Sequence, residues 1–336
     1  MHTGQRQRHY TGVTFRLLLA LFAIFLILIV AQALVNANRA VDTLEQEEKQ
    51  GLAELYTLYN NEIDLRQKSA ETLSISIADR ADVQNIYLTK DRDGLLALLT
   101  PLFNTLKTDY DIVHLYIENL DGTVFVRVHN PAQYGDDITY RRTAAAALEN
   151  VQTISGVEIG PNRLGVRSVT PMFEAGEFIG LVEVGLDYDE PFINSLKERY
   201  GADFRMWVSH EAAAPAGLKP VEGVPNLPIS ELFFYAGTQT TPLPIPAATY
   251  EQVLNTGDPQ TVFVTANGEE LSVLVSPLLA YGDRIIGVLE IVTSRQADLA
   301  ALRTDVFSSI AKTGVFALVG FVLVALIING MVLRPL

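Results

Sequence analysis

Uncharged, strongly hydrophobic stretches lie near both ends of the chain. Residues 17–35 are 19 consecutive positions without a charge, and residues 313–333 are 21 such positions. A helix needs about 20 predominantly apolar residues to cross the hydrocarbon core of a bilayer. The pattern therefore predicts two transmembrane helices, with a long polar part of the chain between them.

The first stretch has a second interpretation. Ala31, Gln32 and Ala33 form a small-residue pattern typical of a signal-peptide cleavage site. The apolar core is longer than the roughly 7 to 15 residues of such a peptide. We therefore expect an uncleaved anchor, and cleavage stays open as the alternative.

Between the two spans, apolar residues first recur at helical spacing. They are Leu44, Leu52, Leu55, Tyr59, Ile63, Ala70, Leu73 and Ile77. Apolar residues three and four positions apart share one face of a helix. The spacing predicts an amphipathic helix over residues 38–80, on the order of 60 Å long at about 1.5 Å per residue. A second helical pattern covers residues 94–108.

From residue 112 the period changes to two, which is typical of strands. Two alternating runs, residues 112–118 and 124–129, flank an Asp-Gly turn, and this arrangement predicts a β-hairpin. One face collects apolar side chains and is expected to pack against the long helix. The other face is polar enough for a ligand. It collects His114, Tyr116, Glu118, Phe125, Arg127 and His129.

The chain then repeats one pattern. Residues 168–183 contain a Pro, a Gly, a second Gly and a Glu that recur in the same order in residues 273–290, 106 or 107 positions later. Each copy reads as strand, turn, strand, and the repeat predicts two related modules in tandem. We expect a linking helix at residues 190–200. Residues 213–246 hold seven prolines and are expected to be largely loop.

Charge separates the ends from the middle. All 39 acidic residues and 21 of the 25 basic residues lie between positions 36 and 312, a formal charge of −18 for that part. The other basic residues flank the two spans: Arg6, Arg8, Arg16 and Arg334. By the positive-inside rule, both ends are expected in the cytoplasm and residues 36–312 outside it, in the periplasm.

Composition narrows the classes of partner and chemistry. An acidic body disfavours a nucleic acid, which needs Lys and Arg to neutralise its phosphates, and it disfavours anionic lipid surfaces. The chain has no cysteine, which removes disulfides, thiol nucleophiles and cysteine-ligated metals. The common catalytic motifs are also missing: a Walker lysine loop, a G-x-S-x-G elbow and H-E-x-x-H. We expect neither an enzyme nor a cofactor.

A series of motifs in the first module resembles a known family. In order they are Phe125-Val-Arg127, Pro131, Gly135-Asp136-Asp137-Ile138, Arg142, Gly156-Val-Glu158-Ile-Gly160, Gly165-Val-Arg167 and Pro171. Their order and spacing resemble double Cache extracytoplasmic sensor domains, which occur in chemoreceptors, sensor kinases and diguanylate cyclase receptors. The likeness covers about 75 residues at motif level, and Ile138 stands where the family usually has Leu. Residues 334–336, Arg-Pro-Leu, resemble the opening of a HAMP linker.

This resemblance implies an α/β (α+β) fold with a long stalk helix and two PAS-like antiparallel-sheet modules between the transmembrane helices. The expected parts are a cytoplasmic N-terminus (1–16), transmembrane helix 1 (17–35), the stalk and second helix (36–110), a membrane-distal module (111–189), a linker helix with a membrane-proximal module (190–295), a helix returning to the membrane (296–312), transmembrane helix 2 (313–333) and the start of a HAMP-like linker (334–336).

Several residues are candidates for binding a small solute in the distal module. They are Arg127, His129, Arg142, Arg167, Tyr116, Phe125 and Asp137. Guanidinium groups bind planar anions bidentately, so the arginines favour an anionic or zwitterionic ligand. Alternatively, these arginines pair with neighbouring carboxylates, the aromatic residues fill a core, and Asp137 caps a helix that starts near residue 139. Two histidines, 114 and 129, make a poor metal site.

The predicted function is the ligand-sensing and transmembrane part of a bacterial signal-transduction receptor, as in chemotaxis, embedded in the inner membrane. A homodimer is expected, because the apolar stripe of the long helix can serve both its own module and a partner. The alternative is a membrane-anchored binding or scaffold protein without signalling output. Trp207 is expected in a core, and no ligand site is assigned to the second module.

Overall fold

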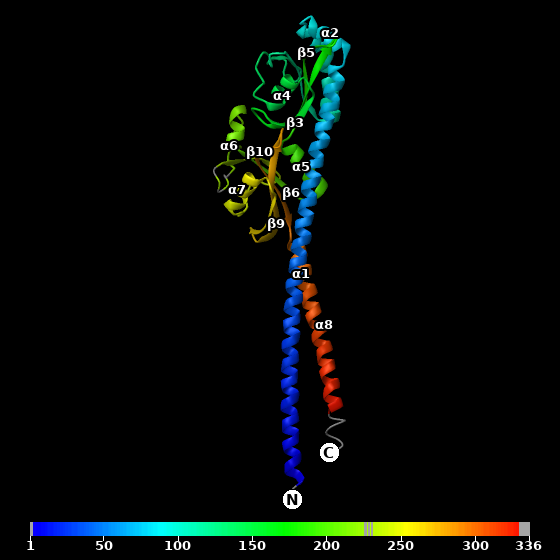
Figure 1. Cartoon of the computed structure of the whole chain (residues 1–336), viewed down its shortest axis with the longest axis vertical. Helices are drawn as coiled ribbons and strands as arrows, with labels where there is room; N and C mark the ends of the chain where they lie inside the picture. The colour runs from blue at the N-terminus through cyan, green and yellow to red at the C-terminus, as the bar shows by residue number, and fades with distance from the viewer. Residues whose placement is uncertain (1–2, 225–226, 228, 230, 329–336) are drawn as a thin grey trace. The chain divides into compact units, whose positions relative to one another are not determined.

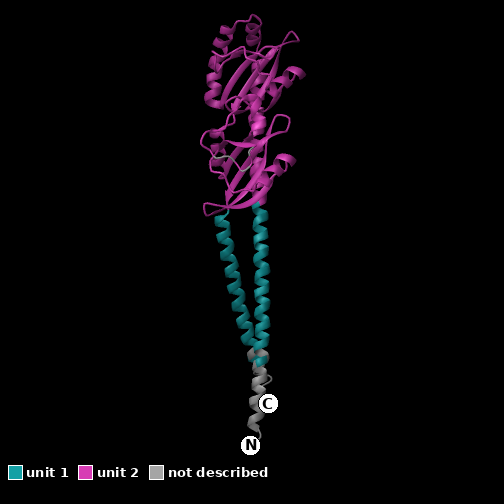
Figure 2. Cartoon of the chain, turned by 90° about the vertical axis from the view of Figure 1, so that its left-hand side faces the viewer, with its two compact units in different colours: residues 1–48, 295–336 teal, residues 49–294 magenta. Residues whose placement is uncertain are grey.

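The computed structural model describes residues 3–328 except 225–226, 228 and 230. The chain folds into two compact units, which are coloured separately in Figure 2. One contains residues 1–48 and 295–336, and the other contains residues 49–294. The HAMP-like residues 334–336 and the last part of the second predicted span lie outside the described residues.

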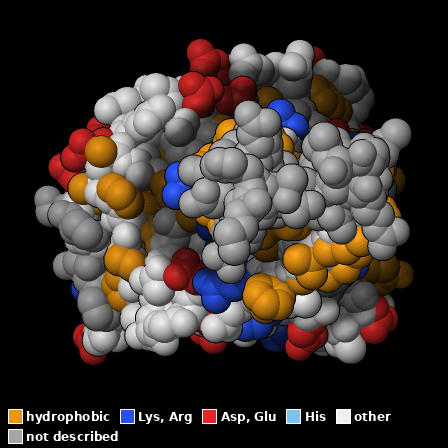
Figure 3. Space-filling view, turned by 90° about the horizontal axis from the view of Figure 1, so that it is seen from below, with side chains coloured by type: hydrophobic (Ala, Val, Ile, Leu, Met, Phe, Trp, Pro, Cys, Tyr) orange, Lys and Arg blue, Asp and Glu red, His pale blue; other side chains and the backbone are white. Residues whose placement is uncertain are grey.

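The first unit is built from the two helices that carry the hydrophobic ends. Helix α1 is Thr3–Ala78 and helix α8 is Gln296–Ile328. Both contain a stretch long and apolar enough to cross a membrane, with none of that stretch buried inside the protein. The rings of Phe22 and Phe321 approach to 4.6 Å. In the view from below, Figure 3 shows hydrophobic side chains gathered in patches among charged ones.

Helix α1 differs from its prediction at its beginning. No separate helix begins near residue 38, because α1 continues without a break from the first apolar stretch into the predicted amphipathic part. Within the second unit, Leu52, Tyr59 and Ile63 are buried in one hydrophobic core. Ala70 and Ile77 are buried in another. The apolar face that the helical spacing predicted therefore contributes to two successive cores along α1 (Figure 1).

Two shorter helices follow α1. They are α2, Ala81–Leu88, and α3, Arg92–Tyr110. Asp91 caps α3, since its carboxylate accepts a hydrogen bond of 2.9 Å from the Gly94 amide, and a carboxylate at this position satisfies an amide that has no partner within the helix. The sequence predicted the second of these helices and missed the first.

The first module is a five-stranded antiparallel sheet in the order β2-β1-β5-β4-β3. Its strands are β1 (Ile112–Glu118), β2 (Val124–Arg127), β3 (Ile154–Ile159), β4 (Leu164–Glu174) and β5 (Glu177–Asp187). Helices α1, α2 and α3 pack on one face. Helix α4, Arg142–Asn150, contacts β3 and β4, and its Ala147 packs on the other face.

A β-bulge changes the predicted hairpin. Ile117 pairs with Val126 but Glu118 pairs with Val124, so Phe125 is the extra residue in β2. A one-residue shift moves a side chain to the opposite face of a sheet. Phe125 accordingly is partly buried and packs against the core on the face that the helices cover, with its ring edge-on to that of Tyr87 and the ring centres 5.2 Å apart. Its expected place on the ligand face is wrong.

The second module repeats the topology of the first. Its five strands have the order β7-β6-β10-β9-β8. Strands β6 to β10 thus take the same positions in this sheet as β1 to β5 take in the first. The strands are β6 (Asp203–Ser209), β7 (Leu232–Gly237), β8 (Gln260–Ala266), β9 (Glu269–Ala280) and β10 (Arg284–Ser294). The other elements are α5 (Glu190–Tyr200), α6 (His210–Ala213), the 3₁₀ helix η1 (Ala214–Ala216) and α7 (Ala247–Thr256). The predicted pair of related modules, and with it the fold class, is confirmed.

The proline-rich segment is less irregular than expected. Strand β7 lies inside residues 213–246, and all six of its residues are buried. Trp207 is fully buried in the core of this module, as predicted. The repeated glycines allow close strand approach: a Cβ atom at Gly287 would lie 1.9 Å from the Trp207 carbonyl oxygen, and one at Gly180 would lie 2.7 Å from that of Glu118.

Candidate functional site

A cavity of about 570 Å³ opens on the face of the first sheet that carries α4. Its walls come from β1, the end of β2, the loop before α4, the turn between β3 and β4, the end of β5, and α3. Four of the predicted site residues line it, namely Tyr116, Arg127, His129 and Arg167. Three of these four, Tyr116, Arg127 and His129, belong to the hairpin face that the alternation of residues singled out.

Arg142 is not among the lining residues, and its neighbour Arg141 is. Arg141 is buried and lines the cavity, whereas Arg142 is exposed at the first position of α4. Adjacent residues point in different directions, so only one member of this arginine pair can face the sheet. The sequence signal was the Arg-Arg doublet itself, which does not say which member points inward.

Asp137 also lies away from the cavity. It is exposed, and its carboxylate accepts hydrogen bonds from the amide and the hydroxyl of Thr139 at 2.8 and 2.7 Å. Because α4 begins only at Arg142, Asp137 caps a turn and not the helix. These bonds lower the pKa of its carboxyl. Its neighbour Asp136 does line the cavity.

Two buried arginines share one carboxylate oxygen at the floor of the cavity. Arg141 Nη1 lies 2.5 Å and Arg167 Nη1 lies 3.2 Å from the same Oε1 of Glu183. Arg141 and Arg167 are each 4% exposed, and Glu183 is fully buried. The carboxylate balances one of the two guanidinium charges. Charge-assisted hydrogen bonds of this kind are short and strong.

A second glutamate adjoins this group. Glu118, on β1, is fully buried, and within the described part of the chain neither of its oxygens has a conventional donor. Burial, followed by the nearby charge of Glu183, raises the pKa of Glu118 well above its usual value. The guanidinium groups of Arg141 and Arg167 outweigh the cost of burial for Glu183, and its pKa is lowered.

Arg127 is held by the loop that precedes α4. Its guanidinium lies 2.8 Å from the Asp136 carboxylate and donates to the carbonyl of Gln133 at 3.1 Å. It also lies 5.0 Å from the centre of the Tyr116 ring, within range of a cation–π contact. The ion pair raises the pKa of Arg127 despite the opposing effect of burial. Arg127 therefore joins the loop to the sheet and remains on the cavity wall.

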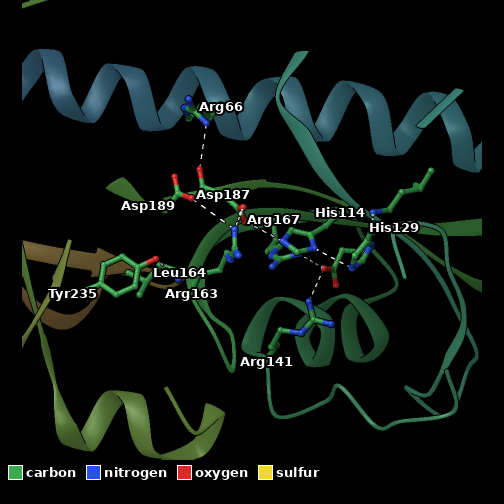
Figure 4. A network of polar contacts seen from close by, with 12 residues as sticks. Arg66, His114, His129, Arg141, Arg163, Leu164, Arg167, Asp187, Asp189 and Tyr235 are labelled. Carbon is green, nitrogen blue, oxygen red and sulfur yellow. Dashed lines mark hydrogen bonds and ion pairs between the residues drawn. The ribbon is translucent and has the colours of Figure 1, made fainter. Parts of the chain in front are cut away.

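The two histidines form a hydrogen-bonded chain (Figure 4). Leu115 N lies 3.4 Å from His129 Nδ1, His129 Nε2 lies 3.2 Å from His114 Nδ1, and His114 Nε2 lies 3.0 Å from Asp187. Burial lowers the pKa of His129 to about 4 and that of His114 well below its usual value. With both rings neutral, each donates through Nε2 and accepts through Nδ1, which satisfies every link.

Asp187 connects the cavity with other elements. Its carboxylate pairs with Arg163 of the β3–β4 turn, and its backbone carbonyl accepts a hydrogen bond of 3.3 Å from Arg66 on α1. Next to Arg163, the Leu164 amide donates to the Tyr235 hydroxyl of β7 at 2.8 Å. Figure 4 shows this network running from the cavity to α1 and to the second sheet.

Positive charge dominates the cavity wall. Five cationic side chains line it, against the two carboxylates of Asp136 and Asp187. The cations are Lys107, Arg127, Arg141, Arg163 and Arg167. Glu183 adds a third negative charge at the floor, which leaves a local excess of positive charge in a chain whose net charge is −14. Within the described residues, no group of three His, Asp or Glu is placed to hold a metal ion.

The corresponding position of the second module is filled by its own side chains. Glu290 of β10 pairs in register with Arg205 of β6, as Glu183 pairs with Tyr116 in the first module. Arg205 Nη2 lies 2.6 Å from Glu290, and the Tyr250 hydroxyl donates to Glu290 at 2.6 Å. Arg205 and Glu290 are both buried. The glutamate that the two modules share therefore pairs with one arginine in the second module and with two arginines in the first.

Comparison with known proteins agrees with this architecture. The sequence pattern of the dCache_3 family, described as the double sensory domain of two-component sensor kinase, matches residues 45–298. The chain belongs to this family. The predicted resemblance to double Cache sensor domains is confirmed, and the match includes both sheet modules and α1 from residue 45 onward. None of the curated protein sequences compared matches the chain.

Solved structures that match the chain include sensory domains from two bacteria. The periplasmic domain of Vibrio cholerae LuxQ has 11% identity and a TM-score of 0.45, and the match covers 72% of this chain and 99% of that one. The sensory domain of the Campylobacter jejuni chemoreceptor Tlp3 with isoleucine bound has 10% identity and a TM-score of 0.46, with 77% and 95% covered. The sensor domain of the V. cholerae histidine kinase DctB has 10% identity and a TM-score of 0.44, with 75% and 98% covered.

Proposed function

We propose that this dCache_3 chain is the sensory and membrane part of a bacterial receptor, and that the cavity of its first module binds a small anionic or zwitterionic solute. The observation that carries the proposal is the sharing of one Glu183 oxygen by Arg141 and Arg167. Glu183 by itself balances only one of the two buried guanidinium charges, and a buried unpaired charge is costly. A carboxylate or similar anion in the cavity removes that cost.

A zwitterion finds a second contact in the same cavity. Asp136 Oδ1 is buried and has no donor among the described residues, while Asp136 Oδ2 is occupied by Arg127. An ammonium group placed against the free oxygen satisfies it, at a different wall from the Arg141 and Arg167 pair. An anion without an ammonium group leaves this oxygen unsatisfied, which distinguishes the two ligand types.

The membrane arrangement follows from charge and from the two apolar helices. We propose that the chain crosses the inner membrane twice, with both ends in the cytoplasm and the two modules in the periplasm, the first of them farther from the membrane. Because the chain contains no cysteine, single cysteines introduced on either side can be labelled with an impermeant reagent. Labelling of a cysteine in the first module from the cytoplasmic side would contradict this orientation.

A homodimer through α1 is also proposed. Leu58 and Leu65 are 39% and 60% exposed, although they lie on the helix that contributes to both cores. They are seven residues apart, so they lie on the same face of the helix. A second copy of α1 would cover these side chains.

The ligand proposal is tested on the full chain in lipid nanodiscs by a thermal-shift screen of amino acids, organic acids, amines and purines. A ligand that binds only the native state at 100 times its Kd stabilises it by about 2.7 kcal/mol. We expect compounds with a carboxylate to raise the melting temperature. A panel in which only amines or purines do so contradicts the anion site, and a panel without any binder favours the scaffold alternative.

Variants then assign the binding to the cavity. Arg141→Gln or Arg167→Gln should weaken binding of a carboxylate hit roughly 10- to 100-fold, since a hydrogen bond to a charged group contributes about 1.5–3 kcal/mol. Arg142→Gln is the matched control, because this neighbour is exposed outside the cavity. Equal affinities in all three variants, measured by calorimetry, would place the ligand elsewhere.

A further inference from the structure

Two arginines that line the cavity, Arg141 and Arg167, lie next to two buried glutamates, and these four charges determine what the cavity can bind. Tyr116 pairs in register with Glu183, and Glu118 lies two residues further along β1, on the same face of the sheet. Glu118 and Glu183 are both fully buried. With both glutamates ionised the four charges cancel, and with one glutamate protonated an excess of one positive charge remains.

The hydrogen bonds show where a proton fits. Glu183 Oε1 receives both arginines, whereas Glu183 Oε2 and both oxygens of Glu118 are buried without a conventional donor in the described part of the chain. Ionised carboxylates only accept hydrogen bonds, so two adjacent ionised glutamates cannot satisfy each other. A single proton on Glu118 lets its hydroxyl donate to Glu183 Oε2, so that only the second oxygen of Glu118, and not all three of these oxygens, is left without a hydrogen-bond partner among the described residues.

We infer that Glu118 carries a proton that it donates in a hydrogen bond to Glu183, and that this proton leaves Arg141 and Arg167 with the positive charge that an anionic ligand neutralises. Glu118 is thus a specificity-determining residue, although it does not line the cavity itself. This inference rests on the proposed anion site and adds the condition under which that site is positively charged.

The other groups around Glu118 agree with this assignment. Glu183 raises its pKa, while Arg141 and Arg167 act in the opposite direction with a smaller effect than burial. The centre of the Tyr116 ring, on the same strand as Glu118, lies 5.3 Å from the guanidinium of Arg141. Burial also raises the pKa of Glu158 on β3, but one oxygen of Glu158 accepts a hydrogen bond of 2.7 Å from the Thr143 amide, whereas neither oxygen of Glu118 has a donor within the described residues. His114 and His129 have lowered pKa values and are neutral above pH 7. Among these groups, Glu118 is the carboxyl that takes up the proton.

Binding should therefore depend on pH with a definite sign. As pH rises through the raised pKa of Glu118, the proton is lost, the four charges cancel and anion affinity falls, by at most about tenfold per pH unit for one linked proton. Sulfate is a suitable probe, because it keeps one charge state across this range. Any pH dependence of sulfate binding then belongs to the protein.

The test compares Glu118→Gln with the wild-type full chain in nanodiscs. Glutamine has nearly the same size, and its amide donates to Glu183 at every pH, so circular dichroism should show a folded protein. Glu149→Gln, an exposed change in the same module, is the control. Infrared difference spectra of wild type and control should contain the carbonyl band of a buried protonated carboxylic acid at neutral pH, and Glu118→Gln should lack it.

Sulfate affinity is then measured by calorimetry at a series of pH values above the usual titration range of a glutamate, because the pKa of Glu118 is raised. Wild type and control should lose affinity as pH rises, and Glu118→Gln should not. The inference is overturned if the wild type lacks the infrared band, if the band persists in Glu118→Gln, or if that variant keeps the wild-type pH dependence. Absence of sulfate binding in every protein, with the infrared result as expected, contradicts the proposed anion site and leaves the proton on Glu118 established.

Discussion

Individual ionisable residues in the cavity link its structure to pH. His129 is kept neutral mainly by burial, with a pKa lowered to about 4 against 6.5 in the unfolded chain. Between these values the unfolded chain binds more protons than the folded one, so stability is full above about pH 6.5 and falls as pH decreases toward 4. The loss is at most about 1.4 kcal/mol per pH unit for this one group.

His129→Asn should flatten this part of the stability profile. An asparagine cannot be protonated in this range, yet it retains an acceptor and a donor for its neighbours. The measurement is the urea-induced unfolding free energy at several pH values between about 4 and 7. A variant whose profile remains as steep as that of the wild type would show that other groups cause the acid sensitivity.

For individual residues, the sequence predicted the sheet face on which the cavity lies better than it predicted which side chains line the cavity. Alternation along a strand decides which face a side chain occupies, so Tyr116, Arg127 and His129 could be placed together. The choice between Arg141 and Arg142 depends on the residue at which α4 begins, and helix ends are poorly fixed by sequence. Pairing of the arginines with neighbouring carboxylates was an open alternative, but the sharing of Glu183 by Arg141 and Arg167 joins segments far apart in the chain, which local patterns do not reveal.

Among the elements, the paired strands of the two sheets leave little space at the repeated glycines. Gly287→Ala should destabilise the protein by about 2 kcal/mol or more, because the new methyl group would overlap the Trp207 carbonyl and the strands must separate. Gly51→Ala on α1 is the matched comparison. Its added methyl group meets nothing within 4 Å, and alanine in a helix is favoured over glycine by about 1 kcal/mol.

Urea unfolding followed by the fluorescence of Trp207, the single tryptophan of the chain, measures both changes. Trp207 is fully buried beside Gly287 and reports directly on the separation of β6 from β10. Gly51→Ala should raise the midpoint, and Gly287→Ala should lower it. A neutral Gly287→Ala would show that the two strands can move apart without cost.

The sequence predicted regular elements well where their periodicity was uninterrupted. The repeat spacing of 106 or 107 residues corresponds to the β4–β5 and β9–β10 hairpins of two sheets with the same strand order. Phe125 was misplaced because a bulge is a local property of strand pairing that alternation does not reveal. Strand β7 was missed because surrounding prolines mark loops, although its own six residues are buried.

For the whole molecule, the proposed dimer gives a direct prediction. Oxidation of a Leu65→Cys variant, in a chain that has no other cysteine, should produce a disulfide-linked dimer. A disulfide needs Cα atoms within about 7 Å, so the same treatment of Glu149→Cys, exposed on the first module, should leave the chain uncrosslinked. Equal crosslinking of both variants in membranes, or none in either, would contradict a dimer through this face of α1.

The contribution of α1 to two successive cores also has a consequence during synthesis. Leu52, Tyr59 and Ile63 leave the ribosome early, yet the last strand of the second module ends only at Ser294. At a translation rate of about 5–20 residues per second, roughly 10 to 50 s pass between the synthesis of this apolar face and the completion of the sheet that covers it. The strands that cover Ala70 and Ile77 end much sooner, at Asp187. During synthesis, the apolar side chains of Leu52, Tyr59 and Ile63 therefore stay exposed to solvent longer than those of Ala70 and Ile77. This is the part of α1 that a chaperone would need to bind.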